Sequence, residues 1–165
     1  EVPLFANDRA DLAQLAGATG VHVGQEDLPP ELARAVDPGL RVGISTHDDA
    51  ELDAVLDAAP GYVDYVAIGP IYETRNKERP SHVVGVDALA ARAARARAAR
   101  PTLPVVAIGG VDAARIAAVA PLVDAVAIIG ALLPAATGAD PYELATAQAR
   151  DLVARISAAQ AGARP

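Results

Sequence analysis

The fold is decided by the stretch Val105-Val106-Ala107-Ile108-Gly109-Gly110, in which a short apolar run ends in a pair of glycines. Such a run is too short for a buried helix, and it is typical of a strand that is covered on both faces. The glycines allow the backbone to approach a ligand closely, and Asp112 can cap the helix that follows. The stretch therefore predicts one strand–loop–helix unit of a parallel α/β sheet.

The same pattern recurs along the chain at fairly even spacing. Apolar runs predict strands over Pro3–Ala6, Gly20–Val23, Arg41–Ser45, Tyr65–Gly69, Val105–Gly109 and Ala125–Ile129. The stretches between and after them predict helices over Asp11–Leu15, Pro30–Val36, Asp49–Ala59, Val86–Arg100, Ala113–Ala120 and Tyr142–Ala159. Strict alternation of strand and helix is typical of α/β proteins with right-handed crossovers.

Polar residues and glycines gather directly after the predicted strands, at Asn7-Asp8, Gly24–Asp27, Ser45–Asp48, Gly69-Pro70, Gly109-Gly110 and Gly130. A doubly wound sheet could hold six such units, but one rim built from consecutive loops is typical of a TIM (β/α)8 barrel, in which phosphate commonly binds after strands 7 and 8. The glycines after the last two strands therefore predict βα units three to eight of such a barrel, in one partial domain over residues 1–165. The start at Glu1 and the absence of methionine lead us to expect a processed or partial chain.

The composition excludes several classes of function. With 52% hydrophobic residues, the chain has the composition of a folded domain. A net charge of −7 makes binding to nucleic acid or to an anionic membrane surface unfavourable. No apolar run reaches the roughly 20 residues that span a bilayer. Because the chain has no cysteine, cysteine-ligated metals, disulfide scaffolds and thiol nucleophiles are excluded.

Carboxylates follow the first two predicted strands, Asp8 within Asn7-Asp8 and Asp27 within Gln25-Glu26-Asp27. Neighbouring parallel strands lie about 4.8 Å apart, so carboxylates at equivalent strand ends can share one hard cation. Mg²⁺ suits such a site, because it takes one or two protein carboxylates and completes its shell with water and phosphate oxygens. The alternative is that Asp8 and Asp27 only cap the helices that follow.

Several further residues have a structural interpretation, and for some of them a functional interpretation competes with it. The Ser45 hydroxyl can donate to a phosphate or can belong to a capped loop, and His47 can be a general base or a hydrogen-bonded surface residue. We expect His22, inside a strand, to be a core histidine with satisfied hydrogen bonds. Asp48 with Glu51 has the spacing of a capping box. The arginines of the fourth predicted helix, Arg92, Arg95, Arg97 and Arg100, favour a solvated face over an anion site.

The longest connection follows the fourth predicted strand, over residues 69–80. Thr74, Asn76 and Lys77 offer hydrogen-bond donors at close spacing, and a lysine can lie over a phosphate as a point charge. A long polar loop at an active-site rim often clamps substrate.

Together these residues resemble the thiamine phosphate synthase family, from the third strand of its barrel to its end. The markers, in the family's order, are Pro3-Leu-Phe-Ala-Asn7-Asp8-Arg9, Gly20-Val-His-Val-Gly-Gln-Glu-Asp27, Gly43-Ile-Ser45-Thr-His47, Gly69-Pro-Ile-Tyr-Glu-Thr74 with Lys77, Ala107-Ile-Gly-Gly110 and Ala127-Ile-Ile-Gly130. No single motif is decisive, but their order and spacing are specific. Asn76 and Gly130 depart from the family, which usually has Thr or Ser at the first position and commonly Ser at the second.

The resemblance implies a role for each of these residues. Asp8 and Asp27 would hold Mg²⁺, and Asn7, Ser45 and Lys77 would bind a pyrimidine diphosphate, with Lys77 and Ser45 acting in catalysis. The residues implied for a thiazole phosphate are Thr74, Arg75, Asn76, Gly109, Gly110, Ile129 and Gly130. The implied partners are these two small molecules, with no nucleic acid and no membrane, in a cytoplasmic enzyme whose homo-oligomeric state is left open.

The family joins 4-amino-5-hydroxymethyl-2-methylpyrimidine diphosphate to 4-methyl-5-(2-phosphoethyl)thiazole and releases pyrophosphate and thiamine phosphate. The resemblance implies dissociative loss of pyrophosphate followed by capture by the thiazole nitrogen, with Mg²⁺ and Lys77 neutralising the leaving group. One alternative is a thiazole tautomerase, but Asp8, Asp27 and Pro70 favour the synthase. Another is a non-catalytic remnant that binds thiamine phosphates.

Overall fold

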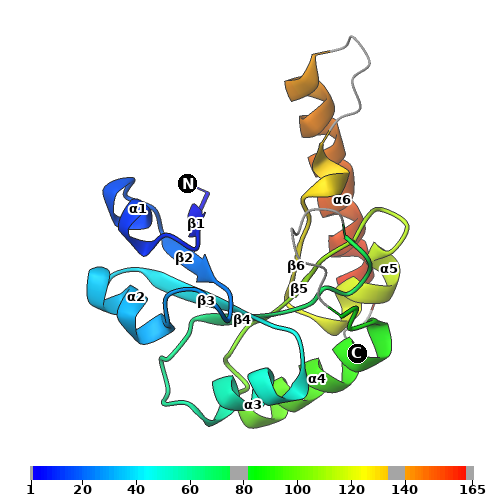
Figure 1. Ribbon diagram of the computed structural model, residues 1–165. Coiled ribbons are helices and arrows are strands. Elements are labelled where there is room, and N and C mark those ends of the chain that lie inside the picture. Colours follow the sequence, from blue (N-terminus) through cyan, green and yellow to red (C-terminus); the bar gives the residue numbers. More distant parts are fainter. Residues whose placement is uncertain (1, 75–81, 134–139, 163–165) are drawn as a thin grey trace.

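Six short strands form one parallel sheet in the computed structural model of the chain, which describes residues 2–74, 82–133 and 140–162 (Figure 1). The strands are β1 (Phe5–Asn7), β2 (Gly20–Val23), β3 (Arg41–Thr46), β4 (Tyr65–Ile68), β5 (Val105–Ile108) and β6 (Ala125–Ala127). They lie side by side in chain order, and every neighbouring pair is parallel. The predicted strands are therefore confirmed, each within two residues at its ends.

A helix follows each strand, as predicted. The helices are α1 (Ala10–Leu15), α2 (Pro30–Val36), α3 (Asp49–Asp57), α4 (Val86–Ala99), α5 (Ile116–Val119) and α6 (Pro141–Ala161), with 3₁₀ turns η1 (Ala120–Leu122) and η2 (Gly130–Leu132). The fifth helix begins three residues later than predicted, because the Asp112 carboxylate accepts the N–H groups of Ala114 (3.0 Å) and Arg115 (3.1 Å) in a turn before it. Among these helices, none is long and apolar enough to cross a lipid bilayer.

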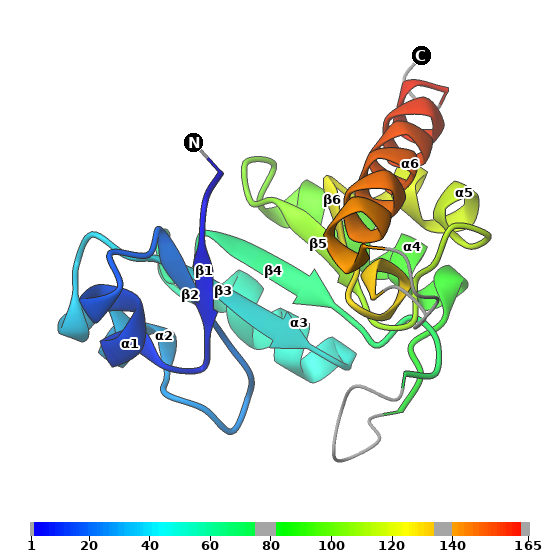
Figure 2. The ribbon, with the colours of Figure 1, turned by 90° about the horizontal axis from the view of Figure 1, so that it is seen from above.

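The sheet curls like part of a barrel wall, with helices on its outer side (Figure 1). Figure 2 shows α1 and α2 beside the first strands, and α5 and α6 beside the last. Alternate residues of the strands face these helices and are fully buried, as Val21, Val42 and Val66 illustrate, and they pack with helical residues such as Leu52 and Leu89. The α/β fold class is thus confirmed, and the described strands form an open sheet with β1 and β6 at its edges.

On the inner side of the sheet, one row of paired residues runs across four strands. Asn7 pairs with His22, His22 with Gly43, and Gly43 with Tyr65. The Tyr65 ring fills the space over Gly43, where a Cβ atom would overlap the ring. Glycine at this position therefore lets a large aromatic side chain cross β3 and reach β2.

The arginines of α4 tie this helix to α3. Arg92, whose side chain is only 13% exposed, donates to the Asp49 carboxylate (3.1 Å) and to the His47 carbonyl (3.0 Å). Arg95 pairs with Asp53 at 3.1 Å, and Arg100 donates to the carbonyl of Leu56 at 2.7 Å. The expectation of a solvated arginine face is therefore wrong for Arg92, because its partners come from a neighbouring helix that the sequence pattern could not identify.

Replacing Gly43 by alanine is expected to destabilise the fold by about 2 kcal/mol, within the range for overpacking a filled site. Urea unfolding followed by circular dichroism measures this change. Gly162→Ala is the matched control, because the nearest atom to a Cβ there lies 3.7 Å away at the open end of α6. Equal unfolding midpoints for the two variants would contradict the packing described.

Candidate functional site

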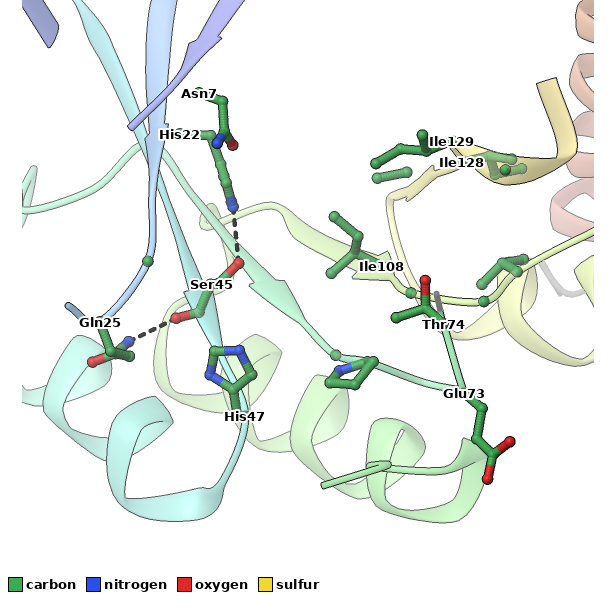
Figure 3. A pocket seen from close by; sticks show the side chains of 18 of the residues that line it. Asn7, His22, Gln25, Ser45, His47, Glu73, Thr74, Ile108, Ile128 and Ile129 are labelled. Carbon is green, nitrogen blue, oxygen red and sulfur yellow. Dashed lines mark hydrogen bonds between the residues drawn. The ribbon is translucent and has the colours of Figure 1, made fainter. Parts of the chain in front are cut away.

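A cleft of about 1060 Å³ lies at the carboxyl ends of the strands. Residues that follow all six strands line it, including Asp8, Asp27, His47, Thr74, Gly110 and Gly130. Figure 3 shows side chains from β1, β2 and β3 on one side of this cleft, and Thr74, Ile108, Ile128 and Ile129 on the other. The predicted common rim of strand-end loops is therefore present.

Most of the predicted site residues meet in this cleft. Its lining includes Asn7, Asp8, Asp27, Ser45, Thr74, Gly109, Gly110, Ile129 and Gly130. The remaining predicted residues, Arg75, Asn76 and Lys77, lie outside the described residues. Residues separated by more than 100 positions in the sequence thus share one cavity.

Asp8 is held in a left-handed backbone conformation, with φ of 62°. This region is uncommon for residues other than glycine, although aspartate and asparagine enter it more readily than most. The Asp8 N–H donates to the His22 carbonyl at 2.8 Å, and its carboxylate accepts from the Asn7 amide at 2.8 Å. These bonds tie the residue to β2 and to the end of β1.

Asp27 is half-buried in the loop after β2, where its carboxylate accepts the Gly24 N–H at 2.7 Å. It therefore closes its own loop and does not cap α2, whose N-terminal cap is Pro29 with no side-chain bond. Asp8 likewise does not cap α1, whose cap position is Arg9. The alternative interpretation of both aspartates as helix caps is wrong.

The two carboxyl groups face each other across the ends of β1 and β2. Partial desolvation in the cleft and the neighbouring Asp27 carboxyl raise the pKa of Asp8. Because Asp8 is exposed, solvent weakens this repulsion. In the described part of the chain, no three acidic, histidine or cysteine side chains are grouped as a metal site. Mg²⁺ does not require three, because water and phosphate oxygens complete its shell.

His22 lies half-buried on the inner face of the sheet and lines the cleft. Its Nδ1 atom is 2.8 Å from the Tyr65 hydroxyl, and its Nε2 atom is 2.9 Å from the Ser45 hydroxyl. Burial lowers the pKa of His22, against the opposing charge of Asp27. Its hydrogen bonds are satisfied as predicted, but its assignment to the core is wrong, because Val21 and Val23 on either side take the helix-facing positions.

The loop after β3 is held from two sides. The Gln25 side chain donates to the Ser45 carbonyl at 2.6 Å, as Figure 3 shows. The Asp48 carboxylate accepts the Glu51 N–H at 2.9 Å, which confirms the predicted cap of α3. The Glu51 carboxylate returns to the N–H (2.6 Å) and Nδ1 (2.9 Å) of His47, one residue before the position that a capping box uses. His47 is thus held at the cleft by hydrogen bonds to the Glu51 carboxylate.

The glycine pair after β5 meets the loop after β4. Gly109 and Gly110 have φ of 96° and 68°, and a Cβ on Gly110 would lie 2.6 Å from the Glu73 carbonyl oxygen. The Arg115 guanidinium lies 4.4 Å from the centre of the Tyr72 ring and donates to the Gly110 carbonyl at 2.6 Å. Packing between these loops already requires the glycines, so their presence alone does not identify a phosphate site.

Several cleft residues were missed by sequence reasoning. They are His22, which was assigned to the core, and Glu51, Glu73 and Asp112, which were given no role in the site. A signal for His22 was available, because a polar residue between two valines in a strand faces the opposite side from both. No comparable signal marks Glu73.

The chain matches, over residues 1–132, the family model described as thiamine monophosphate synthase. A thiamine-phosphate synthase of Koribacter versatilis is 55% identical over 92 residues, which are 55% of this chain and 42% of the relative. A thiamine-phosphate synthase of Escherichia coli O1:K1 / APEC is 41% identical over 147 residues, which are 88% of this chain and 64% of the relative. The chain thus spans less than two thirds of the length of these curated relatives.

Two solved structures resemble the chain. Thiamine phosphate pyrophosphorylase from Pyrococcus furiosus matches with a TM-score of 0.72 and 29% identity, over 94% of this chain and 69% of the other. N-(5'-phosphoribosyl)anthranilate isomerase from the same organism matches with a TM-score of 0.57 and 16% identity, over 94% of this chain and 74% of the other. The second likeness concerns the fold alone.

Replacing Asp8 by asparagine is expected to raise the thermal unfolding midpoint at neutral pH without divalent cations. Its raised pKa means that the charged Asp8 disfavours the fold above that pKa, and this effect disappears as pH falls through it. Asparagine removes the charge and tolerates the left-handed backbone. Asp8→Ala should be less stable than Asp8→Asn by about 1–2 kcal/mol, the cost of that backbone for alanine. A lower midpoint for Asp8→Asn than for the unchanged chain would contradict the repulsion.

The lowered pKa of His22 predicts a loss of stability in acid. The unfolded chain binds this proton at about pH 6.5, and the folded chain binds it only at lower pH. The stability that the neutral, half-buried His22 contributes to the fold is complete above about pH 6.5, and it is lost as pH falls through the folded pKa. Unfolding midpoints measured from pH 8 to pH 5 should therefore fall more steeply for the unchanged chain than for His22→Gln.

His82→Gln is the matched control for this measurement, because His82 is exposed and its replacement leaves His22 in place. Parallel pH profiles for the unchanged chain and His22→Gln would show that His22 is not the group responsible.

Proposed function

Because this chain belongs to the thiamine monophosphate synthase family, we propose that it joins 4-amino-5-hydroxymethyl-2-methylpyrimidine diphosphate to 4-methyl-5-(2-phosphoethyl)thiazole, forming thiamine phosphate and pyrophosphate. The observation that carries this proposal is the facing pair Asp8 and Asp27 at the mouth of a cleft that also contains Ser45 and Thr74. The cleft is large enough for two small substrates, because its volume lies slightly above the usual range for ligand pockets.

Asp8 and Asp27 would hold Mg²⁺ in this proposal. The residues fit such an ion, because partial desolvation and the neighbouring Asp27 carboxyl disfavour the charge of Asp8, and a hard cation between the two carboxyl groups would favour it. The Asn7 amide donates to the Asp8 carboxylate, and the Gly24 N–H donates to the Asp27 carboxylate, so both carboxylates are held in place. When bound, Mg²⁺ supplies neutralisation of the charge that develops on the leaving diphosphate.

Asn7, Ser45 and Lys77 would bind the diphosphate, with Ser45 and Lys77 acting in catalysis. Thr74, Arg75, Asn76, Gly109, Gly110, Ile129 and Gly130 would hold the thiazole phosphate. Backbone N–H groups at Gly110 and Gly130 suit this purpose, because the glycines carry no side chain that would keep a phosphate away. Of the described members, Asn7 and Ser45 lie on one side of the cleft and Thr74 and Ile129 on the other, which would bring the substrates together between them (Figure 3).

The proposed reaction is dissociative. The bond between the pyrimidine methylene carbon and the diphosphate oxygen breaks, and its electron pair leaves with pyrophosphate. The electron-rich aminopyrimidine stabilises the resulting carbocation, and the lone pair of the thiazole nitrogen forms the new carbon–nitrogen bond. No strong base is needed, so the residues of the chain act by binding the leaving group and by holding the thiazole in position.

The six βα units would correspond to units three to eight of an eight-unit barrel, in one domain over residues 1–165 of a cytoplasmic enzyme. Supporting this assignment, the strands run parallel in chain order, and glycines follow the last two described strands.

The proposal is tested by incubating the 165-residue chain with both substrates and Mg²⁺ and reading thiamine phosphate as thiochrome fluorescence. We expect product that disappears with EDTA and falls about 100-fold or more in Asp27→Ala, the order of loss when transition-state charge stabilisation is removed. Asp57→Ala is the matched control, because this exposed aspartate at the end of α3 lies outside the cleft.

Product formation that survives EDTA would contradict the assignment of Asp8 and Asp27 to Mg²⁺. No product from the unchanged chain would contradict the proposal that this chain catalyses the reaction by itself.

A further inference from the structure

His22 connects two hydroxyl groups that come from different strands. The Tyr65 hydroxyl on β4 lies 2.8 Å from Nδ1. The Ser45 hydroxyl on β3 lies 2.9 Å from Nε2, and Figure 3 shows this second bond. Of these groups, His22 and Ser45 line the cleft, while Tyr65 lies behind them. The three side chains therefore form a hydrogen-bonded chain that leads from the sheet to the cleft.

Packing fixes each member of this chain. The Tyr65 ring lies over Gly43, with its centre 5.6 Å from that of Phe5 in an edge contact and 5.6 Å from that of His22 in a nearly parallel one. The carbonyl of Ser45 accepts the Gln25 side chain at 2.6 Å, which holds the serine backbone. Packing and hydrogen bonds thus hold the two rings and the serine backbone, and the positions of the hydrogen atoms decide which group donates.

The chemistry of the two hydroxyls decides where those hydrogens lie. A phenol is more acidic than an alkyl alcohol, so it is the better donor and the poorer acceptor. Among the described residues, His22 is the hydrogen-bond partner of the Tyr65 hydroxyl. Donation from Tyr65 to Nδ1 places the proton of the neutral imidazole on Nε2, because each ring nitrogen sets the state of the other. Nε2–H then donates to the Ser45 oxygen.

We infer that Tyr65 acts through His22 to orient the Ser45 hydroxyl as a hydrogen-bond donor toward an anionic oxygen in the cleft. With its oxygen accepting from Nε2–H, Ser45 directs its own hydrogen elsewhere, and the open side is the cleft. Under the proposed function, on which the identity of the ligand rests, that oxygen belongs to the diphosphate. Tyr65 and His22 are positioning residues in this arrangement.

The position of the histidine proton is the opposite of that in a Ser-His-Asp triad. There a carboxylate accepts the hydrogen of Nδ1–H, which leaves Nε2 unprotonated and able to take the serine proton. Here a phenol donates to Nδ1, so Nε2 is already protonated and cannot act as a base toward Ser45. The pair of Ser45 and His22 therefore serves to bind an anion, although its distance would also suit an activated nucleophile.

The first test measures the tautomer of His22 in the ligand-free chain by ¹⁵N nuclear magnetic resonance of its ring nitrogens. Loss of the signals in His22→Gln assigns them. We expect a protonated Nε2 and an unprotonated Nδ1, and a loss of this preference in Tyr65→Phe, which keeps the ring but removes the donor. A protonated Nδ1 in the unchanged chain would overturn the inference. This readout does not depend on catalytic activity.

The second test is a double-mutant cycle read by the affinity for inorganic pyrophosphate with Mg²⁺, measured by calorimetry. Tyr65→Phe should weaken binding about 2- to 10-fold, the range for one hydrogen bond, when Ser45 is present. It should have no effect in the Ser45→Ala background, because Tyr65 acts only through the serine hydroxyl. An equal loss in both backgrounds would mean a purely structural role and would overturn the inference.

Three further variants complete this design. His22→Gln should retain much of the affinity, because its amide can still donate to Ser45, whereas His22→Leu should lose as much as Ser45→Ala. Tyr142→Phe, which alters an 83% exposed tyrosine on α6, should leave the affinity unchanged. If the unchanged chain bound no pyrophosphate, this result would contradict the proposed function. The tautomer measurement would still decide whether Tyr65 orients Ser45 through His22.

Discussion

The parallel register of β1 to β4 places Asn7, His22, Gly43 and Tyr65 in one row, and the cleft depends on that row. Because Gly43 has no side chain, the Tyr65 ring reaches across β3 and bonds His22. A shift of one residue in any of these pairings would turn the polar side chains toward the helices. The same packing that holds the sheet together therefore also orients the polar groups of the site.

At the pair Asp8 and Asp27, in contrast, the features that suit the proposed function lower the stability of the fold. Asp8 adopts a backbone conformation that favours glycine, and partial desolvation and the neighbouring Asp27 carboxyl disfavour its charge. Hydrogen bonds from Asn7 and Gly24 keep both carboxylates in place despite this cost. Local strain that the surrounding structure maintains is common at functional sites, and here it concentrates negative charge where the proposed reaction requires a cation.

The sequence predicted many of the residues that line the cleft, but it did not predict which residues bond or pack against one another. Asp8, Asp27 and Ser45 were found because each lies at or shortly after the carboxyl end of a strand, and parallel strands end at the same edge of a sheet. The helix-cap alternative for the aspartates could be rejected only from the observed bonds. Arg92 was assigned to solvent because its helix is rich in alanine and arginine, and nothing in that pattern shows that Asp49 packs against it.

The alternation of strands and helices and the order of polar groups along the rim can be predicted from the sequence. Both depend on residues that are close in the chain, such as those of the apolar runs and the Asp48 cap. Which side chains meet depends on how the chain folds, because the bond from His22 to Tyr65 joins residues 43 positions apart. Such a contact depends on the register of three strands and on the space over Gly43, and local pattern carries no information about either.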